Sequence, residues 1–239
     1  MVVPHNPEYI HHSQSKISSS LLREIVFGLE DGMVSTLGAI TGIATATNSQ
    51  FTTLLSGFVV VSVESISMAV GSYLSTKSEK DTDERKLHEE REELKEFPED
   101  ERKELFDMYL RDGWPKKIAM DMAIVAQKDK KLFLLEMAYR ELEIIPNNIE
   151  KPLLQGGVMF VAYIIGGSIP ILPYLFLPID QAVKLSVLFT LLGLFVLGSL
   201  TTRFTKRKWW KAGFEMLILA SLAASVGYFV GQIAGVFLK

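Results

Sequence analysis

The sequence contains no cysteine among its 239 residues and only four histidines. Disulfides and thiolate metal sites are therefore excluded, and carboxylate, imidazole, thioether and water remain as metal ligands. The sequence also has no phosphate-binding glycine loop, nucleophile elbow, histidine-rich zinc signature or basic patch for nucleic acid. The side chains that remain suit the binding of hard or borderline divalent cations. Nothing in the sequence indicates a nucleic-acid partner.

Apolar residues, in contrast, are gathered into long blocks, as is typical of membrane proteins. Five blocks reach the roughly 20 residues that a helix needs to cross about 30 Å of hydrocarbon. They are residues 25–47, 51–75, 153–177, 182–201 and 212–238. We therefore predict an all-α integral membrane protein with five transmembrane helices and a hydrophilic insert between the second and the third.

The basic residues of the short connections predict the orientation in the membrane. The connection 202–211 carries five of them, whereas 48–50 and 178–181 carry none. We therefore expect 202–211, the N-terminus and the hydrophilic insert on the cytoplasmic side. The predicted domains are a cytoplasmic arm at 1–20, transmembrane helices one and two at 21–76, a cytoplasmic acidic helical domain at 77–151, and transmembrane helices three to five at 152–239.

The insert is strongly acidic, because residues 79–107 hold fourteen Asp or Glu against seven Lys or Arg, a balance of about -7. The second transmembrane helix is expected to continue to about Glu96, and Pro98 suits the first turn of a new helix. Gly113 suits the end of that helix, and one or two further helices are expected up to Ile144.

Four glutamates straddle the expected break at Pro98: Glu90, Glu93, Glu101 and Glu104. Residues three apart share a helix face, so each pair presents two carboxylates together, and a metal ion would relieve their repulsion. Acidic runs on helices are, however, usually solvated faces, and composition does not decide between the two interpretations. Further along, Met137 and Glu141 lie one turn apart, and Met137 taken alone is more typical of helix packing than of metal ligation.

Two acidic residues lie inside apolar blocks, Asp31 in the first and Glu64 in the second. A carboxylate near the middle of a spanning helix costs roughly 2.5 to 3.5 kcal/mol on insertion, so such a residue usually has a function. Small residues recur every three or four positions beside Asp31, which predicts that this face contacts protein or water and not lipid. Asp31 and Met68 are expected at similar depths, roughly 9 to 11 Å from the cytoplasmic end, with Glu64 one turn deeper.

A carboxylate together with a thioether suits a borderline ion such as Fe²⁺ better than Ca²⁺ or Mg²⁺. The pattern therefore favours transport of a metal ion or a proton by way of Asp31, Met68 and Glu64. Other interpretations of these residues stay open. Met68 can be a packing residue, and Glu64 can be a buried acid that is kept protonated or is hydrogen-bonded to a neighbouring helix.

These segments resemble the vacuolar iron transporter family, from about Leu22 to Ile233. The resemblance is carried by residues 22–36, 67–73 and 166–174 and by the glutamate pattern with Met137 and Glu141. It implies a homodimer of five-helix subunits in the lipid bilayer. Such a dimer exports Fe²⁺, and also Mn²⁺ or similar ions such as Zn²⁺, Co²⁺ or Ni²⁺, from the cytoplasm in exchange for protons.

The resemblance also implies the metal ligands, which in the membrane pathway match Asp31 and Met68. The resemblance also makes the acidic domain a metal-binding domain. The family's ligands there match Glu90, Glu93, Glu101, Glu104, Met137 and Glu141. Three positions depart from the pattern: Ala138 stands where the family can supply a ligand, Ser72 where many members have glutamate, and Glu64 where a small residue is usual. We hypothesise that Glu64 takes over part of the metal or proton relay.

Two other functions fit parts of the pattern. A membrane-anchored, carboxylate-bridged iron oxidase would use paired carboxylates, but such sites commonly contain Glu-x-x-His, and no histidine follows the glutamates at that interval. A metal-sensing scaffold would need only the acidic domain. We expect a transporter and not an enzyme. Because the N-terminus is short and lacks a sorting extension, we expect a multi-pass protein of a prokaryotic cytoplasmic membrane, with a vacuolar membrane as the alternative.

Overall fold

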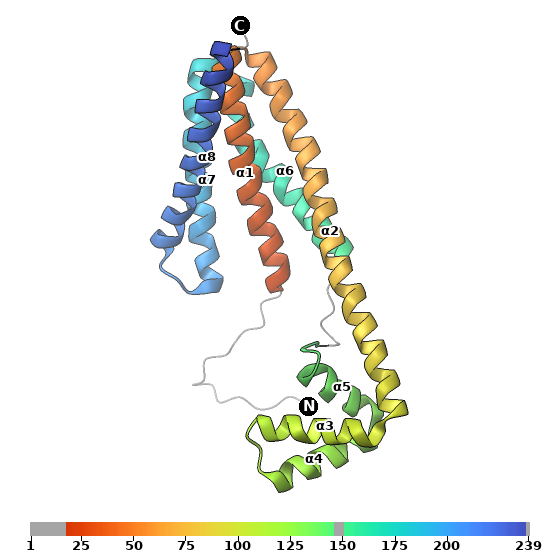
Figure 1. The fold of residues 1–239 in the computed structure, drawn as a ribbon. Coiled ribbons are helices and arrows are strands. Elements are labelled where there is room, and N and C mark those ends of the chain that lie inside the picture. The colour runs from red at the N-terminus through yellow and green to blue at the C-terminus, as the bar shows by residue number, and fades with distance from the viewer. Residues whose placement is uncertain (1–17, 146–150, 238–239) are drawn as a thin grey trace. The chain divides into compact units, whose positions relative to one another are not determined.

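The computed structural model describes residues 18–145 and 151–237 (Figure 1). All regular elements in these residues are α-helices, which confirms the predicted all-α class. In chain order they are α1 (Ser19–Thr47), α2 (Gln50–Glu96), α3 (Pro98–Arg111), α4 (Lys116–Lys128), α5 (Lys130–Arg140), α6 (Pro152–Phe176), α7 (Ile179–Thr205) and α8 (Trp209–Phe237). The predicted arm at 1–20 lies almost wholly outside the described residues.

The chain divides into two compact units, and the division falls within the long helix α2. One unit consists of the chain up to Gly71 together with the chain from Gln155 onward, and the other runs from Ser72 to Leu154. In the first unit α8 packs against both α1 and α7, as Figure 1 shows. The apolar blocks and the acidic insert of the sequence therefore fold around separate cores.

The helices α1 and α6 approach so closely that only hydrogen fits as a side chain at the crossing. A Cβ atom on Gly32 would lie 2.5 Å from the carbonyl oxygen of Tyr163, and one on Gly166 would meet the backbone of Leu29. Small residues permit such close approach of helices in a bilayer. A Cβ atom on Gly28, which lies on the small-residue face beside Asp31, would likewise meet α6. The prediction that this face of the first helix contacts protein is therefore confirmed.

Three helices in the described part of the chain, α2, α6 and α7, are long and apolar enough to cross a bilayer. The helices α1 and α8 have 29 residues each, which is ample length for a span. In α1, however, Glu30 and Asp31 stand among many glycines and threonines, so its mean hydropathy is low. Three of the five predicted spans therefore have the expected length and composition. That all five helices cross the membrane remains a prediction.

The second unit consists of the end of α2 and the helices α3, α4 and α5. The helix α2 runs without a break to Glu96, and α3 begins at Pro98, as the sequence predicted. Asp129 begins α5 by accepting hydrogen bonds from the backbone N–H groups of Lys131 and Leu132. The apolar core of the unit consists of Leu105, Met108, Tyr109, Ala119, Ala123, Ala126, Phe133 and Met137.

Candidate metal site

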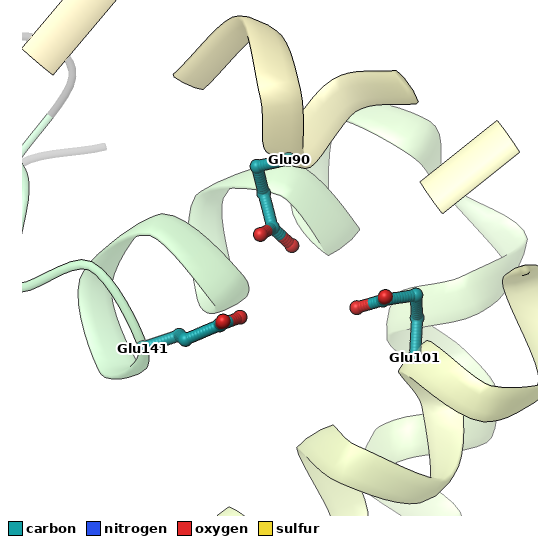
Figure 2. A group of neighbouring side chains, drawn as sticks. All are labelled: Glu90, Glu101 and Glu141. Atoms are coloured by element: carbon teal, nitrogen blue, oxygen red, sulfur yellow. The ribbon is translucent and has the colours of Figure 1, made fainter. Parts of the chain in front are cut away.

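Three glutamate side chains of the second unit point toward one another (Figure 2). Glu90 comes from α2, Glu101 from the first turn of α3, and Glu141 directly follows α5. One carboxylate oxygen from each lies within 4.8 Å of the others. Three oxygen ligands at that separation can bind one hard or borderline divalent cation.

Burial leaves two of these carboxylates without the partners that water would supply. Glu90 is 2% exposed and Glu101 is 8% exposed. The Oε1 atom of Glu90 and the Oε2 atom of Glu101 are buried and have no hydrogen-bond partner among the residues that the structure describes. A buried carboxylate without a compensating partner is costly, and the usual solution is pairing with a charge or with a metal ion. The donor set therefore fits a cation.

The three carboxylates repel one another in a poorly solvated environment. Burial first, and then the charges of Glu141, Glu101 and Glu93, raise the pKa of Glu90 to about 8. Burial, followed by the charges of Glu104 and other neighbouring acids, raises the pKa of Glu101 to about 7. Burial and Glu104 also raise the pKa of Glu141. Without a cation, the site therefore retains protons near neutral pH.

The structure does not bring all the predicted ligands into this group of three. Glu93 and Glu104 are exposed. The charge of Glu93 raises the pKa of all three glutamates in the group, whereas that of Glu104 raises the pKa of Glu101 and Glu141. Met137 is fully buried in the apolar core of the unit, which agrees with its interpretation as a packing residue. Metal ligation by Glu93, Glu104 and Met137 remains a prediction.

A second polar cluster lies in the first unit, within the apolar helices. Asp31 of α1 is half-buried, Glu64 of α2 is exposed, and the two carboxylates are close enough to repel each other. The hydroxyl of Tyr163 in α6 lies 2.5 Å from the Oγ atom of Ser35 and 3.5 Å from the Oε2 atom of Glu64. Met68 lies one turn beyond Glu64 on α2 and is partly buried.

Sequence reasoning did not identify Tyr163 as part of this cluster. Its partners are 128 and 99 residues away in the chain, so no spacing rule connects them. The available signal was a tyrosine hydroxyl inside an apolar block, where a polar group needs a partner. Ser35, by contrast, lies on the small-residue face that the sequence predicted to contact protein.

These features define a helical membrane protein with acidic side chains inside its apolar helices and a buried carboxylate site in a separate unit. The chain belongs to the VIT family, whose sequence model matches residues 22–232. The family that was inferred from the resemblance is thereby confirmed over nearly the whole chain.

Individual relatives resemble the chain over similar lengths. It is 28% identical over 219 residues to vacuolar iron transporter 2 of Oryza sativa subsp. japonica, covering 91% of this chain and 89% of that protein. It is 28% identical over 225 residues to vacuolar iron transporter 1 of Arabidopsis thaliana, covering 93% and 90%. It is 31% identical over 219 residues to the vacuolar iron transporter of Centaurea cyanus, covering 91% and 89%. These are names of transporters, which confirms the prediction of a transporter and not an enzyme.

Proposed function

We propose that this protein exports Fe²⁺, and also Mn²⁺ or a similar divalent ion, from the cytoplasm in exchange for protons. The observation that carries the proposal is the group of Glu90, Glu101 and Glu141, with two buried carboxylate oxygens that have no hydrogen-bond partner in the described part of the chain. The names of the relatives, which are vacuolar iron transporters, support iron as the transported ion. The second unit would collect the ion before it enters the membrane.

The proposal includes five transmembrane helices and a homodimer. Length supports spans for α1 and α8, and their close packing on each other supports a common bilayer environment. The apolar helix α2 exposes Glu64, Ser62 and Ser67. Carboxylates and hydroxyls are rarely left facing lipid, so a second copy of the chain that covers this face would remove a large cost.

Within the membrane, the ion would pass Asp31, Met68 and Glu64. Carboxylate and thioether groups together suit Fe²⁺, which is a borderline ion. An acid cannot hold a proton and coordinate a cation well at the same time. Protons that arrive from the far side of the membrane would therefore weaken the site and release the metal, so competition for one carboxylate would couple the two fluxes.

The orientation rests on the basic connection between α7 and α8, which contains Arg203, Lys206, Arg207, Lys208 and Lys211. Basic connections usually face the cytoplasm, which would also place the second unit there. We propose a prokaryotic cytoplasmic membrane as the host. The names of the relatives favour the alternative, a vacuolar membrane.

Flux measurements on the purified protein in liposomes test this function. Fe²⁺ and Mn²⁺ are expected to cross the membrane faster when the receiving compartment is acidic. Asp31→Ala is expected to abolish the flux, whereas Asp180→Asn, which removes an exposed carboxylate in the first turn of α7, is expected to leave it unchanged. Flux that ignores the pH difference would contradict the exchange with protons. Full activity of Asp31→Ala would instead favour the metal-sensing scaffold.

A further inference from the structure

Tyr163 joins three helices of the first unit through a single hydroxyl group. Its side chain belongs to α6 and is 0% exposed. The hydroxyl oxygen lies 2.5 Å from Ser35 Oγ on α1 and 3.5 Å from Glu64 Oε2 on α2. The second distance is at the outer limit of a hydrogen bond, so a small rotation of the Glu64 side chain decides its strength.

The backbone that carries Tyr163 is held firmly in place. The carbonyl oxygen of Tyr163 is so close to α1 that a Cβ atom on Gly32 would lie only 2.5 Å from it. The backbones of α1 and α6 are therefore in direct contact at this residue. One turn further along, Gly167 lies close to Val61 of α2 and Thr36 of α1. Closely packed helices of this kind shift little, and the hydroxyl of Tyr163 is therefore a fixed point.

Unlike the hydroxyl of Tyr163, the Glu64 side chain is not held in place by close packing. It lies on an exposed face of α2 among exposed apolar neighbours such as Val63 and Ile66. Its side chain has several rotatable bonds, and fixing a side chain of this kind costs rotamer entropy. Without a contact to hold it, the carboxylate would sample many orientations before it met a cation.

We propose that Tyr163, supported by Ser35, is a positioning residue that orients the Glu64 carboxylate toward the transported cation. An ionised carboxylate only accepts hydrogen bonds, so the one proton of the tyrosine hydroxyl points to Glu64. The Ser35 hydroxyl then donates to the tyrosine oxygen. The tyrosine contact occupies Oε2 of Glu64 and leaves Oε1 for the metal ion. The inference rests on the proposed function, because it assigns Glu64 to the path of the ion.

The first test replaces the tyrosine with phenylalanine, which removes the hydroxyl and keeps the ring. Tyr163→Phe is expected to raise the KM for Fe²⁺ flux about two- to tenfold, the effect of one lost hydrogen bond, with little change in kcat. Ser35→Ala is expected to act in the same direction and more weakly. Tyr174→Phe is the matched control, because Tyr174 lies in the same helix and is equally buried, at 1% exposed. Its KM is expected to stay at the wild-type value.

A double replacement separates positioning from general support of the fold. If Tyr163 acts through Glu64, Tyr163→Phe has no further effect on KM when it is added to Glu64→Ala. Additive effects of the two changes would overturn the proposal, as would a wild-type KM in both Tyr163→Phe and Ser35→Ala. Thermal unfolding of each variant identifies any that fails to fold, and Ser35→Ala then carries the test.

An infrared measurement tests the contact without relying on transport. The carboxylate bands of Glu64 are obtained as the difference between the spectra of the wild type and of Glu64→Ala. These bands are expected to shift in Tyr163→Phe and to stay in place in Tyr174→Phe. An unshifted band would refute the positioning role even if Fe²⁺ transport is normal. If the band shifts in Tyr163→Phe but the wild type shows no Fe²⁺ flux, the contact is supported and the proposed function is refuted.

Discussion

Loading the glutamate site of the second unit with a divalent cation is expected to release protons at neutral pH. Without a cation, burial and the neighbouring acids raise the pKa of Glu90 to about 8 and that of Glu101 to about 7. These carboxylates influence each other's titration, and at pH 7 the group is therefore expected to hold roughly one proton or more. A cation binds the deprotonated carboxylates, so roughly one proton or more is expected to leave for each ion bound.

Isothermal titration of the full-length protein measures this number. The heat of Mn²⁺ binding, which avoids the oxidation of Fe²⁺, is compared in two buffers of different ionisation enthalpy at pH 7. The difference in heat gives the number of protons released. At pH 9, above both pKa values, the number is expected to fall well below one.

Two variants assign the protons to the site. Glu90→Gln is expected to bind Mn²⁺ more weakly and to release about one proton fewer, because an amide does not titrate. Asp81→Asn changes an exposed carboxylate of α2 and is expected to behave as the wild type. Tight Mn²⁺ binding at pH 7 without proton release would refute the assignment of the metal to these three glutamates.

Three further predictions follow from the same structure. Because the folded pKa values of Glu90 and Glu101 lie above the ordinary value of 4.5, the unfolded chain binds fewer protons, and thermal stability without metal is expected to fall as the pH rises from about 4.5 to about 8. Added Mn²⁺ is expected to abolish that loss, and a flat profile without metal would contradict it. Glu64→Gln is expected to change both the rate and the pH dependence of Fe²⁺ flux in liposomes, and an unchanged profile would refute its part in the relay. Gly32→Ala is expected to cost about 1–3 kcal/mol in unfolding experiments, because the new methyl group meets the α6 backbone. Gly157→Ala, which has open space around it in α6, is the control and is expected to be neutral or slightly stabilising.

Local sequence signals were sufficient for the helices and for the helix break in the second unit. Proline at position 98 excludes an uninterrupted helix and suits a first turn, and the structure places the break at Phe97. The same signals do not show which glutamates are buried. Glu90 and Glu93 share a helix face by spacing, yet only Glu90 is enclosed, because enclosure depends on where α3 and α5 pack. Tertiary packing decides that choice.

The membrane cluster shows the limit of spacing rules more clearly. An inward-facing Asp31 follows from the glycine pattern of a single helix. The partnership of Tyr163 with Ser35 and Glu64 depends on how three helices cross, and a one-dimensional pattern holds no information about that crossing. Met137 illustrates the reverse case. Its apolar character predicted a core position, and the structure places it in the core.

The glycine contacts of the first unit also bear on how the protein can change conformation. Gly32 and Gly166 bring α1 against the backbone of α6, and Gly227 does the same between α8 and α1. Backbone atoms in contact cannot slide past one another, so these three helices are expected to move as one rigid body. A Cβ atom on Gly57 of α2 would instead first meet side-chain atoms of Ile40 and Ile171, at 3.2 Å. Side chains can change rotamer, which makes α2, the carrier of Glu64 and Met68, the helix best suited to open the ion path alternately to the two sides.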